Sequence, residues 1–446
     1  MRRRHLQARR PLARPATSPP PAFLARALVA LALLAGPAVH AQDDGKYTVI
    51  TGSGESLYRI AIPPVLDGGG AAEPARTLQA VMQNDMTLIG LFKVLSPAGF
   101  LANLAREGTG IELQPWVNVG AQAVVKAKAR LEGGSLVCDF YLYDMGRGAS
   151  PIVTRSYRGS ARSARQLAHR FGDDVVRQYT GDRGIFTTKI AFAAGNPRAK
   201  TSQVYVMDYD GHGAYRASST GPLNVLPAWG PGGQLVYTSW LWNNPDLFLV
   251  GGGRASRISR QPGLNTGAAW SPNGHAIALT MSRDGNSEIY LISPSGGNLR
   301  RLTNNPAIDT SPTWSPDGGR IAFVSNRGGS PQIYVMSSGG GGGRRLTFKG
   351  NYNQEPSWCP RKDTPLVAFT GRDDAGNFDI FTINVESGEM KRLTQGEGSN
   401  RSPSWAPNGR LLVYNSSRGG LWLMNKDGLN QNRVYKGGGQ TPAWSH

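Results

Sequence analysis

The chain has 446 residues, a formal net charge of +19, two cysteines and six histidines. Its positive charge is scattered without a dense Lys/Arg run, which favours protection of strand edges over the alternative, nucleic-acid binding. Cys138 and Cys359 lie far apart and the histidines are widely spread, so the sequence offers no cluster suited to zinc. We expect two separate buried thiols, with a disulfide as the alternative.

Residues 1–41 have the pattern of a secretory signal peptide. Residues 1–26 carry seven Arg and no acid. A nine-residue apolar run from Ala27 to Ala35 and a helix-breaking Gly-Pro pair follow them. We predict cleavage after Ala41. The run is too short to span a membrane, and an uncleaved anchor is the alternative. Cleavage would leave 42 basic and 30 acidic residues, a net charge of +12.

Residues 42–184 are predicted to form a small α/β domain. Apolar residues recur with helical spacing over about 74–90 and 164–179. Strands are expected near 46–50, 57–62, 92–95, 121–131, 136–143 and 152–157. The first segment, 42–52, is polar and then Gly-rich, so we expect it to be mobile and able to add as a strand to a partner's sheet. The alternative is that it forms the first strand of its own domain.

Six tryptophans recur in one short sequence motif through the second half of the chain, as in Pro312-Thr-Trp314-Ser-Pro316-Asp-Gly. We call this motif the Trp phrase. The spacings of the six Trp are 41, 44, 44, 47 and 39 residues, a period typical of repeat architectures. Short β-rich runs follow most phrases and are separated by Gly, Asn, Asp and Ser turns. Each unit therefore reads as four short antiparallel strands, which is a propeller blade. The six residues are Trp229, Trp270, Trp314, Trp358, Trp405 and Trp444.

The last phrase has no strands behind it, because the chain stops at His446. Three β-rich runs without a phrase of their own lie upstream, at 189–192, 204–207 and 215–217. We predict that they complete the last blade. The predicted fold is an N-terminal α/β domain plus a six-bladed β-propeller over residues 185–446, closed by pairing of N- and C-terminal strands.

The sequence contains no catalytic motif that we can identify. A G-x-S-x-G elbow is absent, and His and carboxylates do not converge at matching blade positions. A propeller-type hydrolase therefore stays an alternative only. A peptidoglycan- or carbohydrate-binding propeller is another, but the six repeated Trp are expected to pack between blades. Trp240 and Trp242 lie outside the phrase and are candidates for surface contact.

Together these features resemble the periplasmic TolB family of the Tol–Pal envelope system. The resemblance covers the chain after residue 41 and rests on export, the segment 116–126 (Trp-Val-Asn-Val-Gly-Ala-Gln-Ala-Val-Val-Lys) and the Ser-Pro-Asp-Gly…Ile-Ala-Phe…Ile-Tyr-Val-Met…Arg-Leu-Thr blades. Departures are the 359–363 turn (Cys-Pro-Arg-Lys-Asp) and the Gly runs at 251–253 and 339–343. The resemblance implies a periplasmic, non-enzymatic scaffold that supports outer-membrane integrity and constriction during cell division. No cofactor and no direct membrane insertion are expected, with a cation in the channel left open.

The resemblance also implies two partner sites. The segment 42–52 is expected to bind the C-terminal domain of TolA, through Asp43, Asp44, Tyr47 and Val49. The propeller is expected to bind the lipoprotein Pal, with other envelope proteins as further candidates. Short polar loops before the Trp phrases are expected at the channel mouth, and ordinary solvated loops are the alternative. The candidate Pal contacts are Asn265, Thr266, Asp309, Thr310, Tyr352, Asn353, Gln354, Asn400 and Arg401.

Overall fold

The computed structural model describes residues 57–196, 199, 201–251 and 253–446. The predicted signal peptide, the segment 42–52 with its TolA candidates, and the strand at 46–50 lie outside the described residues. Every described residue belongs to the same compact unit of the chain, residues 43–446.

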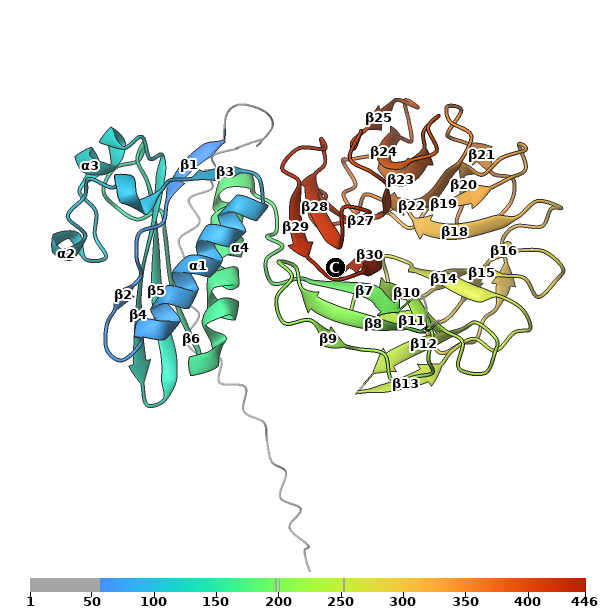
Figure 1. The fold of residues 1–446 in the computed structure, drawn as a ribbon, viewed down its shortest axis with the longest axis horizontal. Helices are drawn as coiled ribbons and strands as arrows, with labels where there is room; N and C mark the ends of the chain where they lie inside the picture. Colours follow the sequence, from blue (N-terminus) through green and yellow to red (C-terminus); the bar gives the residue numbers. More distant parts are fainter. Residues whose placement is uncertain (1–56, 197–198, 200, 252) are drawn as a thin grey trace, which may run out of the picture. The chain divides into compact units, whose positions relative to one another are not determined.

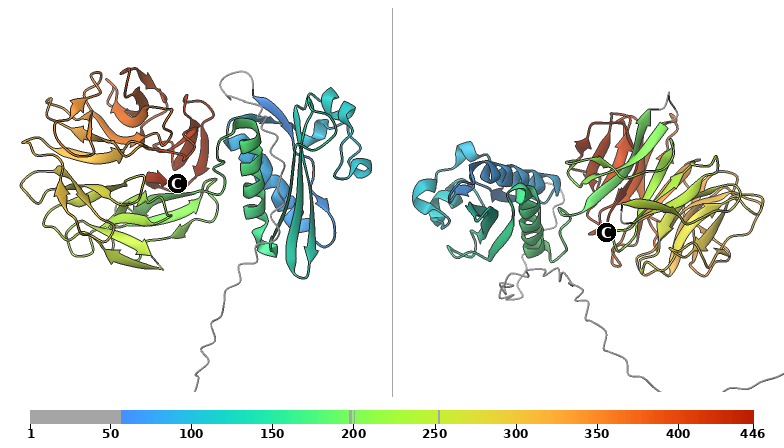
Figure 2. Two further views of the ribbon diagram at one scale, coloured as in Figure 1. Left: turned by 180° about the vertical axis from the view of Figure 1, so that it is seen from behind. Right: turned by 90° about the horizontal axis from the view of Figure 1, so that it is seen from below.

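The first described part of the chain is a mixed sheet with two long helices. The strand order is β3-β1-β4-β5-β6, with β2 also paired to β4. Strand β1 is parallel to β3 and β4, whereas β4, β5 and β6 are antiparallel. Helices α1 and α4 cover one face of this sheet (Figures 1 and 2). The elements are β1 Tyr58–Ala61, β2 Leu66–Asp67, α1 Ala72–Leu88, β3 Phe92–Val94, β4 Ala123–Glu132, β5 Ser135–Asp144, β6 Val153–Ser160 and α4 Ala164–Thr180.

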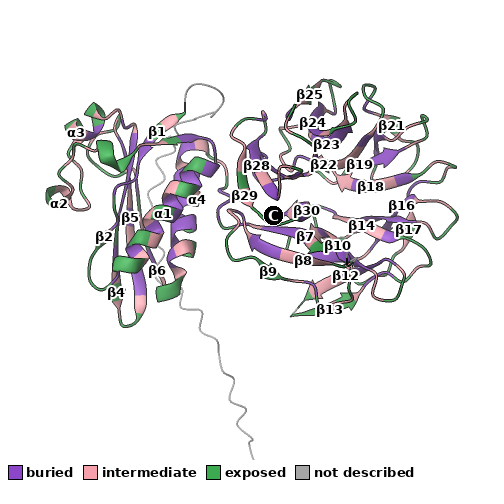
Figure 3. Ribbon diagram, viewed as in Figure 1, coloured by how far each residue is buried: buried purple, intermediate pink, exposed green. Residues whose placement is uncertain are grey.

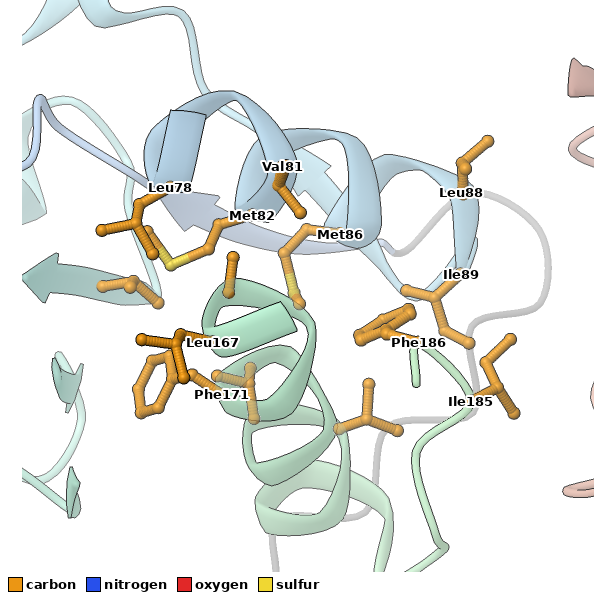
Figure 4. Packing of buried hydrophobic residues seen from close by; sticks show 14 of the residues in the cluster. Leu78, Val81, Met82, Met86, Leu88, Ile89, Leu167, Phe171, Ile185 and Phe186 are labelled. Carbon is orange, nitrogen blue, oxygen red and sulfur yellow. The ribbon is translucent and has the colours of Figure 1, made fainter. Parts of the chain in front are cut away.

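The two helices pack through the apolar stripes that the sequence predicts. Leu78, Met82 and Met86 of α1 face Leu167 and Phe171 of α4 (Figure 4), and all five are buried. Burial of side chains of this size contributes roughly 1.5–3 kcal/mol each, which is what stabilises the helices in water. Helix α4 ends where Gly181 adopts a left-handed φ of 71° and donates its N–H to the carbonyl of Arg177.

An excursion between β3 and β4 contains three short helices that periodicity does not predict: η1 Pro97–Gly99, α2 Leu104–Glu107 and α3 Leu113–Asn118. Trp116 is fully buried, and its indole N–H donates to both carboxylate oxygens of Glu107 at 3.2 Å. Lys126 of β4 forms a buried ion pair with the same carboxylate. Burial lowers the pKa of Lys126, and the hydrogen bond and charge of Glu107 oppose that shift. This explains the two ends of the 116–126 segment, because both converge on Glu107.

Residues 189–444 form six four-stranded antiparallel sheets arranged in a ring, which confirms the six-bladed propeller (Figure 1). The first five blades in chain order begin with the strand that carries the repeated Trp. They comprise β10 Asn224–Trp229, β11 Leu235–Ser239, β12 Asp246–Gly251, β13 Arg254–Arg257; β14 Asn265–Trp270, β15 Ile277–Met281, β16 Glu288–Ile292, β17 Arg300–Arg301; β18 Asp309–Trp314, β19 Arg320–Ser325, β20 Gln332–Ser337, β21 Arg344–Arg345; β22 Asn353–Trp358, β23 Leu366–Arg372, β24 Phe378–Asn384, β25 Met390–Arg392; and β26 Asn400–Trp405, β27 Leu411–Ser416, β28 Leu421–Asn425, β29 Asn432–Tyr435.

The sixth blade is shared between the two ends of the propeller, as predicted. Its sheet order is β30-β7-β8-β9, with β30 Gly439–Trp444, β7 Lys189–Asn196, β8 Thr201–Asp208 and β9 Tyr215–Arg216. The register runs from Gly439 opposite Ala194 to Trp444 opposite Ile190. The Trp444 indole N–H donates to the Thr188 hydroxyl at 2.7 Å. The closing strand therefore leaves β7 without an open edge.

Burial follows position within each blade (Figure 3). Every residue of the middle strands β15 and β16 is buried, because neighbouring blades cover both faces. Such strands read as continuous apolar runs rather than as alternating ones. The outermost strands β17 and β21 are pairs of Arg, so charge stands where unpaired edges would otherwise be exposed.

The turn at 359–363, which departs from the repeated turn sequence, also contacts the segment that follows α4. Arg361 donates to one carboxylate oxygen of Asp182 at 2.6 Å, and Arg410 of the next blade donates to the other at 2.7 Å. Asp182 lies just after α4, so two blades hold the segment that enters the propeller. Cys359 and Cys138 are both buried and free, as expected, and burial raises the pKa of Cys359 to about 11.

Candidate protein-binding site at the channel mouth

The propeller channel is walled by the six strands that carry the repeated Trp. In each of them the pairing register with the next strand shifts in the middle, which marks a β-bulge. The third residue of each strand has a left-handed φ, between 45° and 63°. Five of the six are not glycine, and each of these five retains backbone strain of about 1 kcal/mol. These bulge residues are Leu226, Gly267, Ser311, Glu355, Ser402 and Thr441.

Two cavities follow one another along this channel. The first, about 420 Å³, is lined by the bulge residues and by Thr266 and Thr310. The second, about 520 Å³, is lined by the six repeated Trp. Both share a belt of one residue per strand, which is Pro in five strands and Ala268 in the other. We call the open end of the first cavity the strand-start mouth.

Four of the predicted Pal contacts lie inside the blades. The structure places them at the first position of strands, not in loops, and their side chains are at most 3% exposed. The Asn265 amide donates to the carbonyl of Gln261 at 2.6 Å, and Asp309 accepts from Arg327 at 2.7 Å. Because their side chains are buried within the blades, we remove them from the set of direct contacts. These four are Asn265, Asp309, Asn353 and Asn400.

The other five predicted contacts are half-buried and lie at or directly before the starts of the channel strands: Thr266, Thr310, Tyr352, Gln354 and Arg401. Thr266 and Thr310 line the first cavity. On one side of the rim the Arg401 guanidinium lies 3.4 Å from the centre of the Phe378 ring. The Tyr352 ring stands edge-on to Phe378 at 6.0 Å. The rim therefore combines hydroxyls, an amide and a cationic aromatic cluster, a composition common in protein interfaces.

Exposed apolar side chains on this end of the blades were not among the predicted contacts, although Leu264 and Ile308 belong to the loops expected at the channel mouth and Trp242 was a candidate for surface contact. Leu264 and Ile308 directly precede β14 and β18, and they are 38% and 50% exposed. Phe348 precedes β22 and is 74% exposed, and Trp242, just after β11, is 56% exposed. The Trp242 ring carries the guanidinium of Arg257 at 4.8 Å. For Leu264 and Ile308, the signal available in the sequence was their position directly before the Asn or Asp that begins the strand. Exposed apolar groups on a polar rim mark interaction sites.

Among the described residues, one group of acids and His could hold a metal on distance alone: Asp85, His169 and Asp210, with ligand atoms within 4.8 Å of one another. Both carboxylates are already engaged, and only His169 Nε2 has no hydrogen-bond partner. Asp85 accepts from His169 Nδ1 at 2.9 Å and from the Tyr209 hydroxyl at 2.6 Å, and Asp210 pairs with Arg165. A guanidinium on one ligand disfavours a cation, so these residues do not fit a metal site.

The geometry defines a class: a six-bladed β-propeller behind an α/β domain, with a channel whose wall carries Pro, Thr and Ser and whose mouth has polar and exposed apolar side chains around it. In the described part of the chain, no helix is long and apolar enough to cross a membrane. A family model for the TolB β-propeller domain matches residues 176–446, and one for the TolB amino-terminal domain matches residues 30–150. The chain belongs to the TolB family.

Individual relatives agree with this assignment. The chain is 40% identical over 274 residues to the Tol-Pal system protein TolB of Anaeromyxobacter dehalogenans (strain 2CP-C), covering 60% of this chain and 62% of the relative. It is 40% identical over 216 residues to the Tol-Pal system protein TolB of Geobacter sulfurreducens, covering 48% of this chain and 49% of the relative. The chain thus matches less than two thirds of the length of either relative. The crystal structure of TolB from Acinetobacter baumannii superposes with a TM-score of 0.77 at 27% identity, over 88% of this chain and 98% of that one.

Proposed function

We propose that this chain is a non-catalytic periplasmic scaffold of the Tol–Pal envelope system, supporting outer-membrane integrity and constriction during division. Its strand-start mouth binds the lipoprotein Pal, and its segment 42–52 binds the C-terminal domain of TolA. The observation that carries the Pal part is the accessible wall and rim of this mouth, with Thr310 and Thr266 on the channel wall. Family membership and the names of the relatives support the system.

Substitution of the channel wall tests the Pal site. Thr310→Arg places a long cation in the 420 Å³ cavity, and Gln354→Arg does so on the rim. We expect each to weaken the binding of a purified Pal domain at least tenfold in calorimetry, with the Tm nearly unchanged. The matched control is Thr154→Arg, which changes an exposed Thr of β6. Deletion of residues 42–52 should have the opposite pattern, loss of TolA binding with Pal binding retained. Unchanged Pal affinity in both Arg variants would place the interface elsewhere.

The repeated Trp give little support to a carbohydrate-binding alternative. The indole N–H groups of Trp229, Trp314 and Trp405 donate to backbone carbonyls of a neighbouring blade at 3.0–3.2 Å. Side chains used in this way join neighbouring blades, which accounts for the repeat of the Trp without a ligand. The exposed Trp242 stays outside this argument.

The scaffold proposal predicts that the pure protein has no catalytic activity and needs no cofactor. Asp85 and His169 are buried, and the Asp85 and Asp210 carboxylates are engaged by His169 and Arg165. Peptidase, esterase, lactonase and muramidase assays should show no turnover above a heat-denatured sample. A saturable rate that one point substitution abolishes would contradict the proposal.

A further inference from the structure

The bulge ring at the strand-start mouth contains a single charge. The equivalent positions in the other five strands are Leu, Gly, Ser, Ser and Thr, whereas the fourth blade has Glu355. Among the described residues that line the first cavity, Glu355 is the only ionisable one. Its backbone keeps a left-handed φ of 55°, a conformation that glycine would adopt without strain.

The Glu355 carboxylate is oriented by two donors on one of its oxygens. Oε2 accepts from the Thr370 hydroxyl at 2.7 Å and from the backbone N–H of Ser402 at 2.9 Å. In the described part of the chain, no interaction is found for the second oxygen, Oε1. One end of the carboxylate is therefore fixed and the other is free to accept.

Glu355 also differs from the acids that are fully buried within the blades in having no counter-ion. Asp246, Glu288 and Asp379 each form an ion pair with an Arg of the same blade, namely Arg257, Arg301 and Arg392. In the described part of the chain, the Glu355 carboxylate accepts hydrogen bonds from Thr370 and Ser402 and forms no ion pair with a Lys, Arg or His. Arg401 is adjacent to Ser402, but its guanidinium is held over Phe378. The cavity thus holds one uncompensated negative charge in a chain that is basic overall.

We infer that Glu355 accepts one Lys or Arg side chain of the protein that docks on the strand-start mouth. This rests on the proposed function. A half-buried carboxylate between proline walls attracts a cation more strongly than an exposed one, because less water screens it. The free Oε1 offers the acceptor that an ammonium or guanidinium group needs. The cavity, about 420 Å³, has room for one such side chain but is lined by no second acid to hold a metal ion.

The test is calorimetric titration of the full chain with a purified Pal domain at low and high salt. Glu355→Gln keeps an oxygen for Thr370 and Ser402, so the Tm should be unchanged. We expect Pal affinity to fall about tenfold at low salt, and the loss to shrink at high salt as screening weakens the pair. Glu389→Gln, at an exposed Glu of the same blade, is the control and should leave affinity unchanged.

A charge swap identifies the partner residue. Glu355→Lys should weaken binding further, and Lys→Glu or Arg→Glu substitutions of the Pal domain, made one at a time, should restore it at one position. If Glu355→Gln leaves affinity unchanged while Thr310→Arg abolishes binding, the inference is wrong and the proposed site stands. If neither substitution affects binding, both are wrong. If the Gln effect occurs only with added Ca²⁺, a metal ion occupies the site and the inference is overturned.

Discussion

Deletion of residues 440–446 should abolish cooperative folding of the propeller. The deletion removes all but one residue of β30, and β7 then loses its partner from Gly439 opposite Ala194 to Trp444 opposite Ile190. It also removes the buried Trp444, whose indole donates to Thr188 and whose backbone N–H donates to Ser404 of the fifth blade. Loss of a buried Trp alone costs about 3–5 kcal/mol, and the lost strand pairing adds to it. The total approaches the whole stability of a typical domain, about 5–15 kcal/mol.

Thermal unfolding and size-exclusion chromatography check this expectation. The truncated chain should elute as aggregates or show no sharp transition, because β7 and the side of the fifth blade both become exposed. His275→Ala, at an exposed position of the second blade, is the control and should melt like the full chain. A truncated chain with the normal Tm would contradict the closure derived from the strand pairing.

Replacement of Asp85 should destabilise the contact between α1, α4 and the β8–β9 turn. Asp85 is fully buried and accepts from both His169 and Tyr209. Asp85→Ala leaves these two buried groups without their partner, a loss of about 3 kcal/mol or more. Denaturant unfolding measures it, and Asp374→Ala at an exposed position is the matched control. A change below about 0.5 kcal/mol would show that the network contributes nothing.

The same network makes a pH-dependent contribution. Burial raises the pKa of Asp85 to about 6, although His169 and Tyr209 oppose the shift. Burial lowers the pKa of His169, but the hydrogen bond and charge of Asp85 and the charge of Asp210 raise it above 6.5 overall. Arg165 and Asp173 are the other charged groups nearby. Both raised pKa values favour the folded state when the groups are protonated.

The sign of the effect follows from these directions. The Asp85 contribution is complete below its usual 3.8 and is lost as the pH rises through about 6. The His169 contribution is complete below 6.5 and is lost as the pH rises through its higher folded value. The stability advantage of the wild type over Asp85→Asn should therefore shrink between pH 4 and pH 8. An advantage that grows over this range would contradict the assignment.

Local patterns were enough to predict the long helices and the blades. Helix α1 was expected over 74–90 and occupies Ala72–Leu88, because its apolar residues repeat on one face. The Trp phrase predicted six blades because each copy is one supersecondary unit. The sequence did not predict the short helices α2 and α3. They are held by a tertiary contact, because Glu107 joins them to Lys126, a residue of a distant strand. Four to six residues carry too little periodicity to be recognised.

The sequence predicted which segments reach the channel mouth, but not which of their residues are accessible there. The position of Thr310 before a Trp phrase placed it correctly at the channel wall. Asn265 and Asn353 have the same polar character in sequence, but they are buried. Their partners Asp246 and Gln332 lie 19 and 21 residues upstream, on strands that only blade formation brings close.

The sequence by itself therefore determined the number of blades, the closing strand and the apolar faces of the helices, because repeats and periodicity are local properties. Only the tertiary structure decided which polar residues face the channel. The third and fourth residues of each of these strands line the lumen, whereas the first residue is buried within the blade, and this arrangement depends on the bulge and on strand pairing. Glu355 is an ordinary acid in a polar segment until six strands meet around it. It then becomes the only ionisable residue among those described around the cavity. The described chain beside it supplies no counter-ion.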